Sequence, residues 1–399
     1  MQKKTVLFLV NHDVVIYNFR LELVERLIAD GHEVHISSPY GERIDDLVKL
    51  GCKYHEIKIA RHGTNPVVDG LLILKYVKLI HSVKPDIVFS YTIKPNIYGG
   101  LASRLCGIPY VANITGLGTA VENPGLTQKI TLFLYRIAFK KIQRIFFQNT
   151  ENRQFFIDHN LFVDKHGLLP GSGVNLERFT PLPYPAEDDG IHFVFISRIM
   201  REKGIEQYLD AACHFKAAEL AEAPALRHSE QSDIELSATS CSTILRFEGA
   251  ESRAKTTFHV CGFCEKEYQG KLEELASKGV VNYHGMVRNV REILAKTHCT
   301  IHPSFYPEGI SNVLLESCAC ARPIITTDRS GCRETIDDGV NGFVVKQRDS
   351  KDLIEKVEKF IALTHEQKMQ MGLAGRSKVE REFDRQVVVD AYLKEMECV

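Results

Sequence analysis

Short apolar runs of strand length recur along the first half of the chain, and segments of helix length separate them. The runs are rich in Val, Ile and Phe and show little alternation, which predicts parallel strands buried on both faces. They cover 5–10, 34–37, 86–90, 110–114 and 144–147. The patterns between them predict helices such as 18–29 and 66–82. This order of elements is typical of a doubly wound α/β domain.

The same rhythm restarts after a Gly- and Pro-rich stretch at 168–173, which predicts a linker between two domains. New strands are expected at 193–197, 257–261, 280–283, 299–302, 323–327 and 342–345, and helices around 205–217, 265–277, 309–320 and 352–363. We therefore expect an N-terminal domain at 1–170 and a C-terminal domain at 171–383. A last helix at about 384–399 can pack back onto the first domain.

The expected fold is α/β, with two doubly wound Rossmann-like domains in tandem. The carboxyl ends of two such sheets can face one another, which makes the cleft between them the expected ligand site. One segment, 217–255, breaks the pattern because it is rich in Ala, Glu and Ser and has few apolar residues. We expect it to be an inserted, flexible surface loop.

Composition narrows the classes of protein that fit this pattern. The chain has 399 residues, of which 44% are hydrophobic and 25% charged, so it can build full cores. A net charge of −1 argues against nucleic acid as a partner. No apolar run approaches the roughly 18 residues that span a bilayer. Eleven Cys without regular spacing are typical of reduced thiols, which predicts a cytoplasmic protein.

Positive charge is concentrated in the first half of the chain. Residues 1–180 contain 22 Lys and Arg against 16 Asp and Glu, whereas the remainder contains 28 against 35. Within 126–147 the cations recur at spacings of seven, four and four, at Lys129, Arg136, Lys140 and Arg144. On one helix this spacing forms a single basic stripe among apolar residues. The stretch predicts either a buried helix with a solvated basic edge or, as we favour, a helix on an anionic membrane surface.

The stretch 302–316 contains the most informative candidate site. A strand is expected to end at a Pro-rich loop, and Glu308 and Gly309 then open a helix whose first amides are unpaired. Such amides and the helix dipole favour a bound anion. Glu308 and Glu316 are eight residues apart, so on one helix they share roughly one side. The alternative is an N-terminal Glu that complements the dipole and a second Glu that faces solvent.

Two further loops follow expected strands. Arg198 comes just after the strand at 193–197, and Lys203 precedes a helix start marked by Gly204. Two cations there could bind a diphosphate, although cations in loops are also commonly solvated. In the first domain, NITGLG at 113–118 carries Gly116, which permits close approach of the backbone to a ligand.

Taken together, these stretches resemble a known family. Glu308-x7-Glu316 and the pair Arg198 and Lys203 occur with PGSGVNLERF at 170–179, PIITTDRSGCRETI at 323–336 and GVNG at 339–342. This set is similar to the retaining GT-B glycosyltransferases of family 4. HGTNP at 62–66, YTIKPN at 91–96 and NITGLG at 113–118 resemble the bacterial branch that builds capsule, O-antigen and related glycans on a lipid carrier. The resemblance covers nearly the whole chain except 217–255.

The resemblance implies a GT-B fold, in which two Rossmann-like domains face each other across a cleft, and a role for each candidate residue. Arg198 and Lys203 would bind the nucleotide diphosphate, and Glu316 the ribose hydroxyls. Glu308 would bind the donor sugar and distal phosphate with the amides of Gly309, Ile310 and Ser311, and the Gly116 loop would lie at the donor. Fixed cations and amides suit a reaction that builds negative charge on a departing diphosphate. Such enzymes generally need no metal and no cofactor, and the sequence has no Asp-x-Asp triplet.

The sequence leaves the identity of the general base open. Many family members have a His in the loop that corresponds to Thr115 and Gly116, and this chain has none there. His12, at the end of the first strand, could serve instead, but a capped loop histidine explains it equally well.

The leading hypothesis is a retaining transferase that moves a hexose or N-acetylhexosamine from a nucleotide-diphosphate sugar, with UDP as the expected nucleotide. The implied acceptor is a polyprenyl-diphosphate-linked glycan used in surface polysaccharide synthesis. The enzyme would then work as a peripheral protein at the inner face of the cytoplasmic membrane. The alternatives are a hydrolysing UDP-sugar 2-epimerase of the same fold and a catalytically inert glycan-binding homologue.

Overall fold

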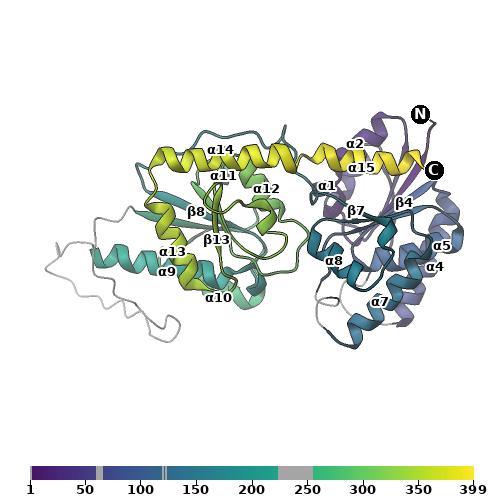
Figure 1. Ribbon diagram of the computed structural model, residues 1–399, viewed down its shortest axis with the longest axis horizontal. Helices are drawn as coiled ribbons and strands as arrows, with labels where there is room; N and C mark the ends of the chain where they lie inside the picture. The colour runs from purple at the N-terminus through teal and green to yellow at the C-terminus, as the bar shows by residue number, and fades with distance from the viewer. Residues whose placement is uncertain (1, 60–65, 119–120, 122–123, 223–254) are drawn as a thin grey trace. The chain divides into compact units, whose positions relative to one another are not determined.

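A computed structural model describes residues 2–59, 66–118, 121, 124–222 and 255–399 (Figure 1). The chain divides into two compact units. The first contains Met1–Asn175, Pro307–Asn312 and Glu382–Val399, and the second contains Leu176–Tyr306 and Val313–Arg381.

A seven-stranded sheet forms the centre of the first unit, in the order β3-β2-β1-β4-β5-β6-β7 with every neighbouring pair parallel. Its strands are β1 (Thr5–Leu9), β2 (Glu33–Ser38), β3 (Lys53–Glu56), β4 (Ile87–Tyr91), β5 (Tyr110–Ile114), β6 (Arg144–Phe147) and β7 (His166–Leu168). The strand order reverses between β1 and β4, which is the switch point where doubly wound sheets bind ligands.

Helices cover both faces of this sheet. They are α1 (Val14–Phe19), α2 (Leu21–Ala29), α3 (Ile44–Lys49), α4 (Pro66–Val83), α5 (Gly100–Cys106), α7 (Leu126–Ala138), α8 (Thr150–Asp158) and α15 (Arg385–Glu397), with short turns η1 (Pro95–Gly99), η2 (Phe139–Lys141) and η3 (Val163–Lys165). One core includes Tyr76 of α4 and Tyr135 of α7, and the core on the other face includes Leu23 of α2 and Tyr392 of α15. Figure 1 shows α15 beside α2.

The second unit repeats the same topology around six parallel strands, in the order β10-β9-β8-β11-β12-β13. The strands are β8 (Ile191–Ile196), β9 (Thr256–Cys261), β10 (Asn282–Tyr283), β11 (Cys299–His302), β12 (Ile324–Thr327) and β13 (Gly342–Val345). The helices are α9 (Ile205–Glu222), α10 (Lys266–Ser277), α11 (Val290–Leu294), α12 (Asn312–Ala319), α13 (Ser350–Ile361) and α14 (His365–Glu382), with turns η4 (Arg201–Lys203) and η5 (Arg333–Thr335). The prediction of two doubly wound α/β domains is therefore confirmed.

Three expectations about individual elements need correction. The expected helix at 18–29 is broken at Arg20, whose φ of −140° separates α1 from α2. The basic stripe along 126–147 does not lie on one helix, because α7 ends at Ala138 and Arg144 opens β6, where an aromatic and β-branched run favours sheet pairing.

The third correction concerns the inserted loop expected at 217–255. Residues 217–222 continue α9, since Ala, Glu and Leu are strong helix formers, and β9 begins at Thr256. Residues 223–254 lie outside the described residues.

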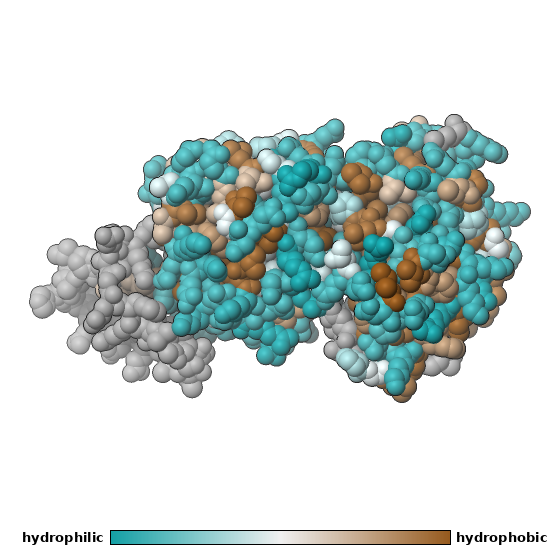
Figure 2. Space-filling model, in the orientation of Figure 1, coloured by the Kyte–Doolittle hydropathy of each residue, from teal (hydrophilic) through white to brown (hydrophobic). Residues whose placement is uncertain are grey.

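The surface seen in Figure 2 is mainly hydrophilic, with separate hydrophobic patches on both units. Among the described residues, no helix has the length and apolarity of a bilayer-spanning segment.

Candidate active site

Two cations meet at one aromatic ring in the second unit. The guanidinium carbon of Arg198, just after β8, lies 5.5 Å from the centre of the Tyr306 ring. The Nζ atom of Lys203, at the end of η4, lies 5.0 Å from the same centre. Arg198 is exposed and Lys203 is only 8% exposed. Because β8 and β11 flank the switch point of the second sheet, both charges lie where such sheets bind ligands.

The loops that follow β8 and β11 hold each other in place. Gly204 has a φ of +79°, and a Cβ atom there would lie 2.2 Å from the carbonyl oxygen of Pro303, so another residue would be strained and would clash. The Phe305 N–H donates to the carbonyl of Glu202 at 2.9 Å. These contacts fix the backbone that carries Tyr306. Sequence reasoning missed Tyr306, although an aromatic residue directly before Pro307 in a loop after a strand was the available signal.

Glu308 and Glu316 do not lie on one helix. Glu316 is half-buried on α12, which begins at Asn312, whereas Glu308 lies four residues before that start. The expectation that the helix opens at Glu308 and Gly309 is therefore wrong. In a helix the carbonyls of these two residues would accept backbone N–H groups, but here both accept the side-chain amide of Asn149.

The segment Pro307–Asn312 belongs to the first unit, where loops after three neighbouring strands surround it. Gly116 lies in the loop after β5, and a Cβ atom there would lie 3.0 Å from the carbonyl oxygen of Pro307. Gln148 follows β6, and its Oε1 atom would lie 2.0 Å from a Cβ atom at Gly309. Gly171 lies in the loop after β7, and a Cβ atom there would lie 2.6 Å from Cβ of Ile310. Both Ile310 and Ser311 are buried, so these close approaches hold the segment firmly.

His12 lies in the loop after β1, at the switch point of the first sheet. Its Nδ1 atom contacts the carboxylate of the buried Asp13 and accepts the backbone N–H of Val14 at 3.3 Å. The Asp13 carboxylate also accepts the backbone N–H of Arg43 at 2.7 Å, which fixes this carboxylate. The His12 side chain is one-third exposed. The position suits a ligand-facing group, and a role as general base stays a prediction.

The structure thus brings some predicted residues together. Arg198 and Lys203 meet at Tyr306, and Gly116 packs against the segment that carries Glu308, Gly309, Ile310 and Ser311. Within the described ranges, no group of three or more His, Cys, Asp and Glu side chains could hold a metal ion.

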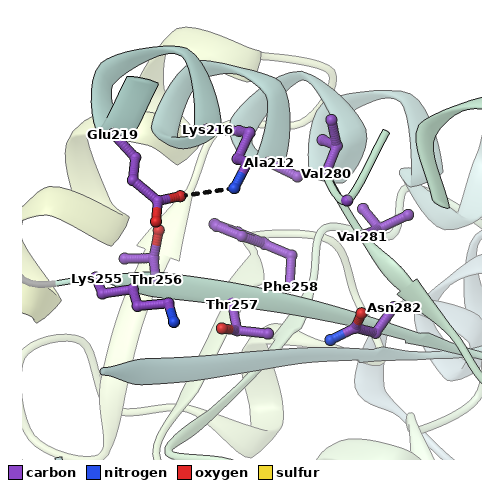
Figure 3. Close-up of a pocket in the computed structure, with 11 residues that line it drawn as sticks. Ala212, Lys216, Glu219, Lys255, Thr256, Thr257, Phe258, Val280, Val281 and Asn282 are labelled. Atoms are coloured by element: carbon purple, nitrogen blue, oxygen red, sulfur yellow. Dashed lines mark hydrogen bonds and ion pairs between the residues drawn. The ribbon is translucent and has the colours of Figure 1, made fainter. Parts of the chain in front are cut away.

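Two cavities in the described part of the chain contain none of these residues. One, of about 160 Å³, lies at the amino end of β9 and is lined by Lys216, Thr257 and Asn282 among others (Figure 3). There Lys216 is paired with Glu219 at 2.9 Å. The other, of about 600 Å³, lies beside α4 and is lined by His55, Lys58, Lys75 and Lys78 together with neighbouring residues. Since open α/β sheets bind ligands at the carboxyl ends of their strands, we do not place the reaction in the first cavity.

Comparison with known proteins identifies two family models along the chain. The Glycosyl transferase 4-like model matches residues 5–149, and the Glycosyl transferases group 1 model matches residues 225–362. An N,N'-diacetylbacillosaminyl-diphospho-undecaprenol alpha-1,3-N-acetylgalactosaminyltransferase from Campylobacter jejuni is 26% identical, with 97% of this chain and 96% of that protein aligned. The capsular polysaccharide biosynthesis glycosyltransferase CapM of Staphylococcus aureus is 24% identical over 82% of each chain.

Solved structures with the same fold align over almost the full length. A glycosyltransferase from Rickettsia africae gives a TM-score of 0.76 at 18% identity and covers 99% of this chain and 98% of its own. Anabaena Alr3699/HepE in complex with UDP gives a TM-score of 0.73 at 16% identity, covering 99% of this chain and all of its own. These similarities confirm the GT-B fold.

Proposed function

Because the chain is a glycosyltransferase of the group 1 and 4-like families with a GT-B fold, we propose that it is a retaining enzyme that uses a UDP-linked hexose or N-acetylhexosamine. The acceptor in this proposal is a lipid-linked glycan of surface polysaccharide synthesis. The observation that supports the donor assignment best is the meeting of Arg198 and Lys203 at Tyr306.

The proposed chemistry breaks the bond between the sugar C1 and a diphosphate oxygen and forms a bond from C1 to an acceptor hydroxyl oxygen on the same face of the sugar. Arg198 and Lys203 stabilise the negative charge on the departing diphosphate. Glu308 and the amides of Gly309–Ser311 hold the sugar and the distal phosphate. The hydroxyl proton has to leave as the new bond forms, and His12 is the candidate that we retain for accepting it.

We propose that this transfer needs no metal ion or cofactor. In this proposal Arg198 and Lys203 bind the diphosphate, and Lys203 lies at a nearly buried position, where electrostatic interactions are stronger than in water. Glu316 would bind the ribose.

The relatives support the choice of substrates. The HepE structures hold UDP or UDP-glucose, which supports UDP as the nucleotide here. The Campylobacter relative is named for a diphospho-undecaprenol acceptor, which supports a polyprenyl-diphosphate-linked acceptor for this chain. With such an acceptor, the enzyme would work at the cytoplasmic face of the inner membrane.

We also propose that helix α7 meets that membrane surface. Its exposed apolar residues are Leu126, Ile130 and Phe133, which are 74%, 50% and 60% exposed. Spacings of four and three place them in one stripe, and the exposed cations Lys129 and Arg136 border it. Apolar residues beside cations are what an amphipathic helix presents to anionic lipid. The proposed contact therefore uses α7 alone, without Arg144.

A thermal-shift comparison tests the donor assignment. We expect UDP to raise the midpoint of unfolding more than GDP or ADP at equal concentration, with the same shift in the presence of EDTA. A nucleotide at 100 times its dissociation constant stabilises the folded protein by about 2.7 kcal/mol. Equal shifts with all three nucleotides would contradict the choice of UDP, and loss of the shift in EDTA would contradict metal-independent binding.

A further inference from the structure

Asn149, the second residue after β6, connects the sheet of the first unit to the segment that carries Glu308. Asn149 is 2% exposed. Its Nδ2 atom donates to the carbonyl oxygen of Glu308 at 3.0 Å and to that of Gly309 at 2.7 Å. Its Oδ1 atom accepts the backbone N–H of Asn152 at 2.8 Å and so caps helix α8. The Asn149 side-chain amide thus has two roles. Its oxygen caps helix α8, and its nitrogen holds the segment that carries Glu308.

We infer that Asn149 is a positioning residue that aims the backbone N–H groups of Gly309 and Ile310 at the departing diphosphate. This inference rests on the proposed function. In a planar trans peptide the C=O and N–H groups point in opposite directions. Fixing the Glu308 carbonyl on Asn149 therefore turns the Gly309 N–H away from Asn149. Fixing the Gly309 carbonyl does the same for the N–H of Ile310.

The surroundings keep the two peptide planes in this orientation. A Cβ atom at Gly309 would lie 2.0 Å from Gln148 Oε1 and 2.7 Å from the carbonyl oxygen of Thr115. The Gln148 side chain is itself within 3.4 Å of Asn113 Oδ1 and of Ser172 Oγ. The backbone at Gly309 is thus confined on one side by Gln148 and Thr115 and held by Asn149. Oriented amides that need no rearrangement during the reaction are effective at stabilising developing negative charge.

The change Asn149→Ser separates the two purposes of the side chain. Serine is a good N-cap, so α8 keeps its cap, but the donor to the two carbonyls is lost. We expect kcat to fall about thirtyfold, because misplacing groups that act in the transition state costs about tenfold to a hundredfold. We expect the KM for the UDP-sugar to change by less than about threefold, because the interaction strengthens in the transition state. The midpoint of thermal unfolding should stay near that of the wild type.

Asn152→Ser is the matched control, because it changes the same turn of α8 while the contact with Asn149 involves only the Asn152 backbone. It should keep the wild-type kcat. A wild-type kcat in Asn149→Ser would overturn the inference, as would an equal loss in both variants.

A second measurement keeps the inference separate from the proposed function. If the wild-type protein transfers no sugar, the proposed function fails, and hydrogen exchange then tests the role of Asn149. Exchange in the peptide that covers 307–312 should be faster in Asn149→Ser than in the wild type, with exchange in β8 and β11 unchanged. Unchanged exchange in 307–312 would show that Asn149 does not hold the segment.

Discussion

Tyr306 gives the proposed donor site its most specific geometry at the scale of single residues. One ring faces two cations, so removing either charge leaves the other in place on the same ring. We expect Arg198→Ala and Lys203→Ala each to lower kcat about a hundredfold, which corresponds to about 3 kcal/mol of transition-state stabilisation. Steady-state kinetics with saturating UDP-sugar measures this.

Arg201→Ala is the control for that prediction. Arg201 lies in the same turn η4, but its side chain is 68% exposed and its guanidinium faces Glu206 at 3.5 Å. Its loss should change kcat by less than about twofold, as for most exposed ion pairs. Wild-type activity in both Arg198→Ala and Lys203→Ala would contradict the proposal that these two cations bind the diphosphate.

Residues adjacent in the chain were the ones that the sequence could assign. Arg198 and Lys203 follow one strand and lie only five positions apart, so a local motif draws attention to both. Asn149 and Glu308 are 159 positions apart, and nothing in either local pattern indicates that they meet. The start of α12 was misplaced for the same reason. The distant side chain of Asn149 binds the carbonyls of Glu308 and Gly309, which would accept backbone N–H groups in a helix.

Helix α7 carries the membrane proposal at the scale of elements. The double change Ile130→Glu and Phe133→Glu places two acids in its exposed apolar stripe, so we expect co-sedimentation with anionic phosphatidylglycerol vesicles to fall at least about fivefold at low salt. Leu373→Glu, at a 41% exposed position on α14, is the control and should bind as the wild type does. Added salt should weaken wild-type binding. A wild-type protein that stays in the supernatant at low salt would contradict the proposal.

A row of histidines crosses neighbouring strands of the second sheet. His192 Nδ1 lies 3.0 Å from His259 Nε2, and His259 Nδ1 lies 2.9 Å from His284 Nε2. His298 Nδ1 accepts the backbone N–H of His192 at 3.0 Å. Burial, followed by the neighbouring His192 and His284, lowers the pKa of His259 from 6.5 to about 4. Burial also lowers the pKa of His298 to about 4, in spite of its contact with the carbonyl of Ala186.

The sign of the resulting pH dependence follows from these lowered pKa values. The folded state favours neutral imidazole, so its stabilisation is complete above the unfolded pKa near 6.5 and is lost as the pH falls towards 4. We expect the free energy of unfolding to drop by about 2 kcal/mol for each of the two histidines over this range. Urea unfolding at a series of pH values measures the drop. It should be smaller in His259→Gln and unchanged in His81→Gln, which lies on α4, and equal drops in both variants would refute the assignment.

Apolar strands were the elements that the sequence located best. The runs at 144–147, 299–302 and 342–345 coincide with β6, β11 and β13. The sequence did not reveal β3 or β7, because KYHE is polar and HGL is short and contains a glycine. Both are end strands. Each is held by pairing with a buried neighbouring strand, so its own sequence does not need an apolar run. Likewise, the break at Arg20 reflects a buried guanidinium that lies 5.1 Å from the centre of the Tyr91 ring.

At the scale of the whole molecule, each unit carries its own set of candidate residues. Arg198, Lys203 and Glu316 belong to the second, whereas Gly116 and Pro307–Asn312 belong to the first. The fold class followed from the sequence because strand and helix periodicity repeats twice along the chain. The membership of Pro307–Asn312 did not, because this segment of six residues, which ends at the first residue of α12, carries no signal of the unit with which it packs.

The stereochemistry of the product is the most direct test of the proposed retaining transfer. The full chain is incubated with an α-linked UDP-N-acetylhexosamine or UDP-glucose and a glycan linked to polyprenyl diphosphate, and the new linkage is read by NMR. Retaining transfer predicts UDP release together with an α-linked product on the lipid-linked glycan. A β-linked product, or UDP release that yields only a free sugar or its 2-epimer, would contradict it.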